Sequence, residues 1–449
     1  MLFQEGQTAL IVEALHKSGK PAFCGLLLVA SIVGATMIGG GGALRAKAAP
    51  ESRMASLFFV VLPFANASGD PHKEYIAANI TSDLTAGLSG ITDSLVIAHS
   101  SAGAMASQPL SEISRRFGIT YAVRGSTSAD GVRVKLTVML LRAESEEQLW
   151  SERFEDDLAA LSTLEREIIA GIARRLGVTF ADVGLPRPPL SAQDLPALDS
   201  LLRAQVAAEM PATAQTIAQA QGLFAMAARS PRLAAEAKAG LAAVHLLSAL
   251  SRGSASARDL AECDLLVHEA LAADSRNSRA LNTLGALLRA TGRPREALGA
   301  YEAAAVVNRN DANALGQIGR LKIEIGEPAQ ALSQIELALR LSPLDSQRAL
   351  WLSYAGLALL YMGDAAGARP WLEKSVAAAP QFVTALVFLA AAQQLDGRNE
   401  EARRTIAAVQ RVNPTLSVAR VDQQFAPAEG GRAEWLRIRD SLRQAGLPN

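Results

Sequence analysis

The residues that most often carry chemistry in proteins are scattered along this chain. The two cysteines, Cys24 and Cys263, lie far apart, so the sequence predicts neither a disulfide framework nor a cysteine-based metal site. No two histidines have the spacing of an HExxH or HxxxH zinc motif. No nucleophile–base pair, paired-carboxylate motif or phosphate loop stands out. We therefore expect no metal, no cofactor and no enzymatic activity. The five histidines are His16, His72, His99, His245 and His268.

Two groups of polar residues keep an enzymatic alternative open. The acidic clusters at 144–147 and 156–157 stand near the ends of predicted strands, where solvated turns explain them better than catalysis does. The loop from Asn66 to His72 follows a predicted strand, and ligands often bind at the carboxyl ends of strands in open α/β sheets. Its Asn, Ser, Gly, Asp and Pro residues are equally typical of a turn. An enzyme with its active site in this region remains the less favoured hypothesis.

The charge balance argues against a nucleic-acid-binding protein. The chain of 449 residues has 44 Lys plus Arg and 44 Asp plus Glu, so its formal net charge is zero. Such a chain has no long-range field that would attract DNA or RNA, and it shows no basic recognition unit. Apolar residues make up 49% of the sequence and aromatic residues only 5%. This composition is typical of helices that pack through small side chains.

Residues 21–44 contain no charged side chain and predict a transmembrane anchor. A helix of that length reaches ~36 Å, enough to cross a hydrocarbon layer of ~30 Å. Residues 1–20 then form a short N-terminal segment and residues 45–55 a linker. The alternatives are a signal peptide cleaved near the A-x-A sequence at 46–48 and a buried helix of a soluble domain. Small residues four apart, Ala30 and Gly34, suggest a homodimer through this helix.

Residues 56–178 predict a small α/β domain with a mixed sheet. Short apolar runs and amphipathic stretches alternate in the order β-α-β-α-β-β-β-α. An Asp-Gly turn at 130–131 separates two alternating segments and predicts a hairpin. The expected strands are 57–62, 95–98, 121–127, 132–141 and 148–154, and the expected helices are 75–88, 110–117 and 158–176.

Three blocks of this domain resemble the TolB amino-terminal-like family. They are residues 61–71 (VLPFANASGDP), 118–126 (GITYAVRGS) and 149–154 (LWSERF), in the order that the family has them. The resemblance implies an envelope or signalling protein, since some members carry an adenylate cyclase or a CadC-like winged-helix domain ahead of this one. Only about twenty residues precede the apolar run here, so we expect this chain to lack such an output domain.

After a proline-rich linker at 179–196, the sequence repeats every 34 residues. Gly285 and Gly319 have this spacing, and a three-residue insertion at 343–348 then shifts the next small residue to Gly356. Such a period, with small residues at fixed points, is the signature of tetratricopeptide repeats. Further pairs 34 apart are Gly292 and Gly326, Ala297 and Ala331, Ala304 and Ala338, Gly363 and Gly397, and Ala368 and Ala402.

About six helical hairpins are therefore predicted for residues 197–416, with residues 417–449 capping the open end of the stack. A stack of this kind has a concave groove lined by the first helix of each hairpin. The groove-facing positions carry polar and partly basic side chains that suit an acidic peptide. A solvated helix face is the alternative for any one of them. The candidate site residues are Arg279, Asn282, Arg289, Asn313, Arg320, Ser353 and Gln394.

The sequence thus predicts a transmembrane helix, an α/β domain and an all-α tetratricopeptide-repeat solenoid. We interpret it as a membrane-anchored, non-enzymatic scaffold or sensory module that binds a protein or peptide. The resemblance implies a single-pass protein of a bacterial inner membrane, with periplasmic soluble domains. The alternative from the same resemblance is the regulatory half of an adenylate-cyclase-type signalling system.

Overall fold

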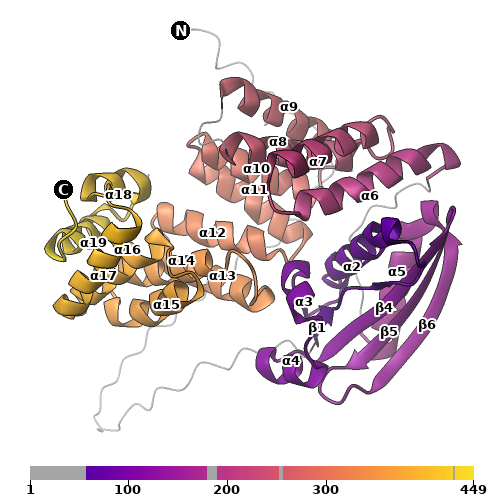
Figure 1. Ribbon diagram of the computed structural model, residues 1–449, viewed down its shortest axis with the longest axis horizontal. Helices are drawn as coiled ribbons and strands as arrows, with labels where there is room; N and C mark the ends of the chain where they lie inside the picture. Colours follow the sequence, from indigo (N-terminus) through magenta and orange to yellow (C-terminus); the bar gives the residue numbers. More distant parts are fainter. Residues whose placement is uncertain (1–56, 179–189, 252–255, 428–429) are drawn as a thin grey trace, which may run out of the picture. The chain divides into compact units, whose positions relative to one another are not determined.

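The computed structural model describes residues 57–178, 190–251, 256–427 and 430–449 (Figure 1). The predicted anchor at 21–44 and the alternatives to it lie outside these ranges. Within them, no helix combines the length and the apolar character that crossing a bilayer requires.

The N-terminal part of the described chain contains the predicted mixed sheet. The strand order is β3-β1-β4-β5-β6, and the short β2 pairs with β4 beyond the end of β1. β1 is parallel to β3 and β4, whereas β4, β5 and β6 are antiparallel neighbours. The strands are β1 (Leu57–Val61), β2 (Ala65–Asn66), β3 (Ser94–Val96), β4 (Tyr121–Asp130), β5 (Arg133–Arg142) and β6 (Gln148–Asp157).

Helices cover both faces of this sheet. Phe59 and Val61 of β1 belong to a core formed with α2 (Glu74–Leu88) and α5 (Leu161–Leu176). Phe58 and Val60 point to the other face, where α3 (His99–Met105) and α4 (Leu110–Phe117) pack. Alternate residues of a strand face opposite sides of the sheet. Because helices pack on both sides of β1, every residue of this strand is apolar. Helix α3 and strand β2 are the elements that the sequence pattern did not predict.

Helical hairpins follow, with the predicted number and order. Each helix packs against its hairpin partner and against the next hairpin along the chain. The hairpins are α6 (Leu195–Glu209) with α7 (Ala214–Ala227), α8 (Ala234–Ser251) with α9 (Ala257–Ala273), α10 (Ser278–Ala290) with α11 (Pro294–Val307), α12 (Ala312–Glu324) with α13 (Pro328–Leu341), α14 (Arg348–Tyr361) with α15 (Ala365–Ala378), and α16 (Val383–Leu395) with α17 (Asn399–Val412).

The small residues of the repeat stand where two helices nearly touch. A Cβ atom on Gly319 of α12 would lie 2.4 Å from Ile335 Cγ1 of α13 and 3.1 Å from the Ala331 carbonyl oxygen. Gly326 ends the same helix with φ of +86°, a left-handed conformation that favours glycine. The two glycines that recur every 34 residues therefore have different roles, one in the close helix contact and one at the helix end.

The three-residue insertion of the repeat has a structural explanation. It lengthens the connection between α13 and α14, and this connection binds the start of α3 in the α/β domain. The Ala98 amide donates to the Leu341 carbonyl at 2.8 Å, and the Leu344 amide donates to the Ser101 hydroxyl at 3.0 Å. The Ser101 and Ser342 hydroxyls, both buried, lie 2.9 Å apart. The insertion therefore supplies polar partners that a regular repeat would lack.

Matched glycine substitutions test the close approach of the helices. We expect Gly319→Ala to lower the free energy of unfolding by about 1–3 kcal/mol, because the added methyl group overpacks the α12–α13 contact. Gly299→Ala is the control, since a Cβ there meets nothing within 4 Å on an exposed part of α11. It should be neutral or stabilise by up to about 1 kcal/mol. Urea unfolding measures both, and equal effects would contradict the packing argument.

Candidate functional site

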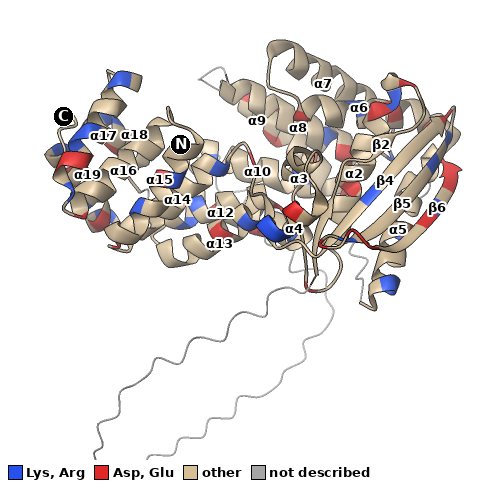
Figure 2. Cartoon of the chain, turned by 60° about the horizontal axis from the view of Figure 1, so that its bottom comes forward, with Lys and Arg blue, Asp and Glu red and all other residues tan. Residues whose placement is uncertain are grey.

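The first helices of the hairpins form a continuous inner layer. Helix α8 contacts α10, α12 contacts α14, and α14 contacts α16. We call the surface of these helices that faces away from the second helices the inner face. Figure 2 shows basic and acidic positions interspersed along the helices of the repeats.

Two of the predicted site residues link neighbouring hairpins. Arg279 at the start of α10 lies 3.3 Å from Glu236 of α8, measured from Nε to Oε1. The Asn282 side-chain amide donates to the Asp311 carboxylate, which caps α12, at 2.6 Å. Asn313, in the first turn of α12, is exposed and accepts from Gln347 at 3.4 Å. Part of the predicted polar surface therefore fixes the stacking of the hairpins.

Two other predicted residues, Arg289 and Arg320, come together with two tyrosines in what we call the arginine cluster. The cluster consists of Arg289, Tyr301, Arg320, Glu324 and Tyr354, from α10, α11, α12 and α14. Arg320 Nε donates to Glu324 Oε1 at 2.8 Å, and the guanidinium carbon lies 5.7 Å from the centre of the Tyr354 ring. Stacking of this kind on an aromatic face stabilises a cation.

The tyrosines of the arginine cluster are buried beside the two cations. Burial raises the pKa of the Tyr301 hydroxyl to about 12, and the nearby Arg289 and Arg320 guanidinium groups partly oppose that rise. Burial also raises the pKa of Tyr354, against the same two arginines. Both phenols are therefore neutral at physiological pH and can donate a hydrogen bond to an anionic group.

Arg289 is the member of the cluster with spare hydrogen-bonding capacity. Its side chain is hydrogen-bonded to Tyr301, but its Nε atom is buried without a hydrogen-bond partner, and among the described residues its guanidinium group pairs with no carboxylate. Arg320, by contrast, is neutralised by Glu324. A buried, uncompensated guanidinium donor is costly unless a ligand satisfies it. The cluster is thus suited chemically to a carboxylate.

The remaining two predicted residues lie elsewhere on the inner layer. Ser353 of α14 is 0% exposed, and its hydroxyl donates to the Leu350 carbonyl at 2.7 Å. Its expected place on an open groove is therefore wrong. Gln394 is half-buried at the end of α16. Both belong to the part of the inner layer on which the C-terminal helix α19 (Arg432–Gln444) packs.

Sequence reasoning missed the tyrosines and acids of the cluster. The Tyr301 ring is buried against Gly285, as expected for an apolar position of a second helix, and this position gives no indication that its hydroxyl lies beside two arginines. Tyr354 lies beside Arg320 only because α12 and α14 stack, so no spacing within one repeat pointed to it. Glu324 stands four residues after Arg320 on the same helix, a spacing that the sequence contains. The signal that could have found Tyr354 is the presence of Arg320 and Tyr354 on two consecutive first helices, α12 and α14.

The hypothesis of a ligand site at the Asn66–His72 loop finds a simpler explanation. The Asn66 side-chain amide donates to the Asp70 carbonyl at 2.8 Å, and the Ser68 hydroxyl donates to Asn66 at 2.6 Å. The Asp70 carboxylate accepts from the His72 amide at 2.9 Å. These polar groups close their own turn. Among the described residues, no group of three His, Cys, Asp or Glu is placed to hold a metal ion.

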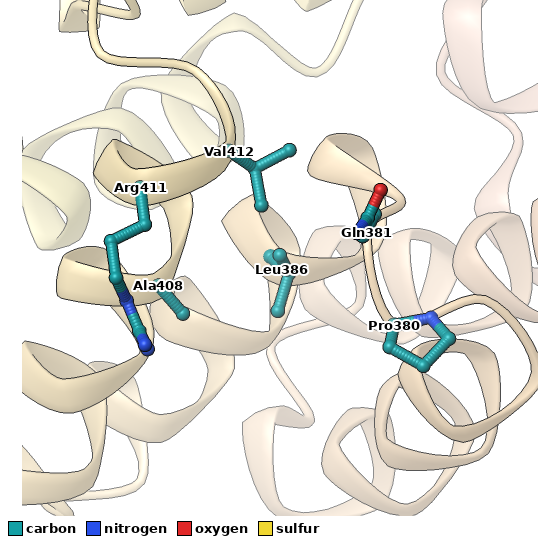
Figure 3. A pocket seen from close by; sticks show the side chains of 6 residues that line it. All are labelled: Pro380, Gln381, Leu386, Ala408, Arg411 and Val412. Atoms are coloured by element: carbon teal, nitrogen blue, oxygen red, sulfur yellow. The ribbon is translucent and has the colours of Figure 1, made fainter.

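Two surface depressions have little catalytic potential. One lies between α16 and α17 and contains a single charged group, the Arg411 guanidinium (Figure 3). The other is lined by the Trp150 ring, Gly171, Arg174 and Arg175. Neither lining set includes a carboxylate, a thiol or a histidine. The arginine cluster is therefore the strongest candidate for a functional site.

Comparison with curated proteins gives one distant relative over part of its length. No family model matches the chain. Putative adenylate cyclase 3 of Rhizobium meliloti (strain 1021) is 29% identical over 200 residues, which is 44% of this chain and 32% of that protein. The chain thus spans about a third of that relative's length.

Similar solved structures include tetratricopeptide repeat proteins. PilF of Pseudomonas aeruginosa is 19% identical with a TM-score of 0.42, over 50% of this chain and 96% of that one. YrrB, described as a TPR protein with an unusual peptide-binding site, is 22% identical with a TM-score of 0.32, over 43% and 92%. A tetratricopeptide repeat protein of Parabacteroides merdae ATCC 43184 is 14% identical with a TM-score of 0.37, over 57% and 99%. The 34-residue hairpins of this chain themselves mark it as carrying such repeats.

Alkaline titration tests the buried Tyr301 phenol. Its folded-state pKa of about 12 exceeds the ordinary value of 10.0, so the folded chain keeps a proton that the unfolded chain releases. The stability from this group is fully present below pH 10 and is lost as the pH rises toward 12. We expect Tyr301→Phe to lose less stability between pH 9 and 11.5 than the unaltered chain in urea unfolding. A tyrosinate absorbance transition near pH 10 assigned to Tyr301 would contradict the burial argument.

Proposed function

We propose that this chain is a protein-interaction module that binds an acidic segment of a partner through the arginine cluster. The observation that carries the proposal is Arg289, a cation on the inner layer whose Nε is buried without a partner. The stacked hairpins support it, because they present an extended inner face to which a peptide can bind. In this proposal the chain has no catalytic role.

The chemistry of the cluster supports a carboxylate as the group recognised. Guanidinium groups bind carboxylates through two parallel hydrogen bonds, and charge-assisted hydrogen bonds are roughly twice as strong as neutral ones. The neutral Tyr301 and Tyr354 hydroxyls are further donors beside the cations. Glu324 compensates Arg320, so a single acidic side chain or a C-terminal carboxylate would balance the remaining charge.

The setting that we propose is a bacterial inner membrane, with residues 21–44 as a single-pass anchor and the soluble domains in the periplasm. Support for it comes from the uncharged run of the sequence and from the resemblance of residues 56–178 to TolB amino-terminal-like domains. A homodimer through the anchor is part of the same proposal and is supported by the small residues at spacing four.

A second candidate function is the regulatory part of an adenylate-cyclase-type signalling system. The observation that favours it is the relative named putative adenylate cyclase 3, of which this chain covers 32%. An enzyme with its active site in the α/β domain is a third, weaker candidate. Production of cyclic AMP from ATP by the purified chain would favour an enzyme over a binding module.

Selection from a random peptide library tests the proposal that the arginine cluster binds a carboxylate. We expect panning of a random peptide library against the purified chain to enrich acidic sequences. Replacing Asp and Glu of an enriched peptide by Asn and Gln should weaken binding at least tenfold, since a charge-assisted hydrogen bond contributes about 1.5–3 kcal/mol. Arg289→Gln should cause a loss of the same order, and binding should weaken as salt is added. Fluorescence anisotropy measures each affinity.

Arg404→Gln is the matched control for this experiment, because Arg404 is an exposed cation on α17 of the last hairpin. It should bind the enriched peptide as the unaltered chain does. Arg289→Gln should change the melting temperature little, since in the described part of the chain Arg289 pairs with no carboxylate and Gln can also donate to the Tyr301 hydroxyl. Enrichment of neutral peptides, or equal binding by the Arg289→Gln and Arg404→Gln variants, would exclude the arginine cluster as the site.

A further inference from the structure

The inner face changes its chemistry halfway along the repeats. In α12 it carries Arg320 and Glu324. The positions of α14 and α16 that are equivalent to Arg320 in the repeat are occupied by Leu357 and Ala391, which are 7% and 0% exposed. The neighbouring residues Tyr361 of α14 and Val387 of α16 are also buried. A solvated groove has no reason to be apolar, so something covers this half.

Helix α19 covers it. Trp435, Ile438 and Leu442 stand three and four residues apart, which places them on one face of the helix. Each is 0% exposed, and all three belong to one core cluster with Leu357, Leu360 and Val387. The helix packs against α16 and reaches back to α14. The C-terminal segment, predicted to cap the stack, thus also covers part of the inner layer as far back as α14.

The start of α19 contacts the inner layer through close backbone approaches. A Cβ atom on Gly431 would lie 2.8 Å from the Tyr361 ring, and one on Gly430 would lie 3.1 Å from the Ile325 carbonyl oxygen. The Arg437 guanidinium donates to the Leu360 carbonyl at 3.3 Å, near the end of α14. The terminal carbonyl groups of a helix lack partners within it, so a cation there is favourable.

The opposite face of α19 is charged and satisfied within the helix itself. Asp440 lies 3.1 Å from Arg439 and 2.8 Å from Arg443, and these arginines hold the pKa of its carboxyl below the usual range. Arg432 and Arg443 are exposed. An amphipathic helix whose apolar side lies in a groove, with its charged side in water, is a recurrent mode of peptide recognition.

We propose that the inner face of α14 and α16 is a binding site for an amphipathic helix, and that α19 is its resident occupant. The partner is a helix with an aromatic residue followed by aliphatic residues three and seven positions later, the pattern of Trp435, Ile438 and Leu442. This site is separate from the arginine cluster, since it binds an apolar helix face and not a carboxylate. Because α19 is tethered, it competes at an effective concentration in the millimolar range. An external helix therefore binds weakly until α19 is released.

A labelled peptide with the sequence of residues 430–448 tests the site in the full chain. Ile438→Asp with Leu442→Asp releases α19, because burying these carboxylates is unfavourable. We expect this variant to bind the peptide at least tenfold more tightly than the unaltered chain, as measured by fluorescence anisotropy. The same peptide with Trp435→Ala and Ile438→Ala should not bind. Arg432→Asp with Gln444→Asp changes the exposed face and is the matched control, which should bind as the unaltered chain does.

If the released variant loses its helical circular dichroism signal, a full chain with a cleavable connection to α19 provides the test instead. A protease recognition sequence inserted between Pro427 and Gly430 allows α19 to be cut from the folded chain. We expect the cut helix to exchange for the labelled peptide, and failure to exchange would overturn the proposal. The proposal would also be overturned if the released and the unaltered chain bound the peptide equally. The same holds if the released chain bound the Trp435→Ala, Ile438→Ala peptide as tightly as the unsubstituted peptide.

Discussion

The contact between the two helices of a hairpin leaves no space for a methyl group at one point in each of three successive hairpins, and the packing of the solenoid depends on this contact. At Gly285, Gly319 and Gly356 a Cβ atom would lie within 2.4–2.7 Å of Tyr301, Ile335 or Leu372. Such a close approach fixes the two helices of each hairpin against each other. It also determines which side of each first helix remains for the inner face. Because the contact recurs, neighbouring hairpins stack in the same way.

One scaffold thereby presents two chemically different surfaces. Positions that are equivalent in the repeat place Arg320 on α12 and Leu357 on α14, and the fold tolerates both because neither takes part in the close contact. The arginine cluster contains two cations, of which Glu324 neutralises Arg320 while the Nε atom of Arg289 has no partner. The apolar half would be unfavourable in water, and α19 removes it from solvent. The boundary between the halves lies where Gly430 and Gly431 contact the ends of α12 and α14.

The insertion between α13 and α14 shows how an irregularity in a repeat can have a specific role. A regular turn would end α13 without the hydroxyl and carboxylate groups of Ser342 and Asp345. These groups lie 2.9 Å from the Ser101 hydroxyl and 2.8 Å from the Ser100 hydroxyl of α3. The connection in which the period is broken thus contacts the α/β domain, which also packs against α6.

The sequence by itself determined the hairpins, their order and most of the sheet, because these follow from short-range periodicity. The 34-residue spacing of glycines predicts the hairpins. The alternation of apolar and polar residues in β5 predicts a strand with one buried face, and the apolar run of β1 predicts a buried strand. It also selected Arg289 and Arg320 from their positions within a repeat. Only the tertiary structure brought Tyr301 and Tyr354 to Arg320, because these contacts join different hairpins, whereas Glu324 follows Arg320 by one helical turn. The tertiary structure also decided that Ser353 is buried and that α19 turns back onto α14 and α16. The amphipathic pattern of Trp435, Ile438 and Leu442 predicts a helix with a buried face, but it contains no information about which of the available apolar surfaces that face covers.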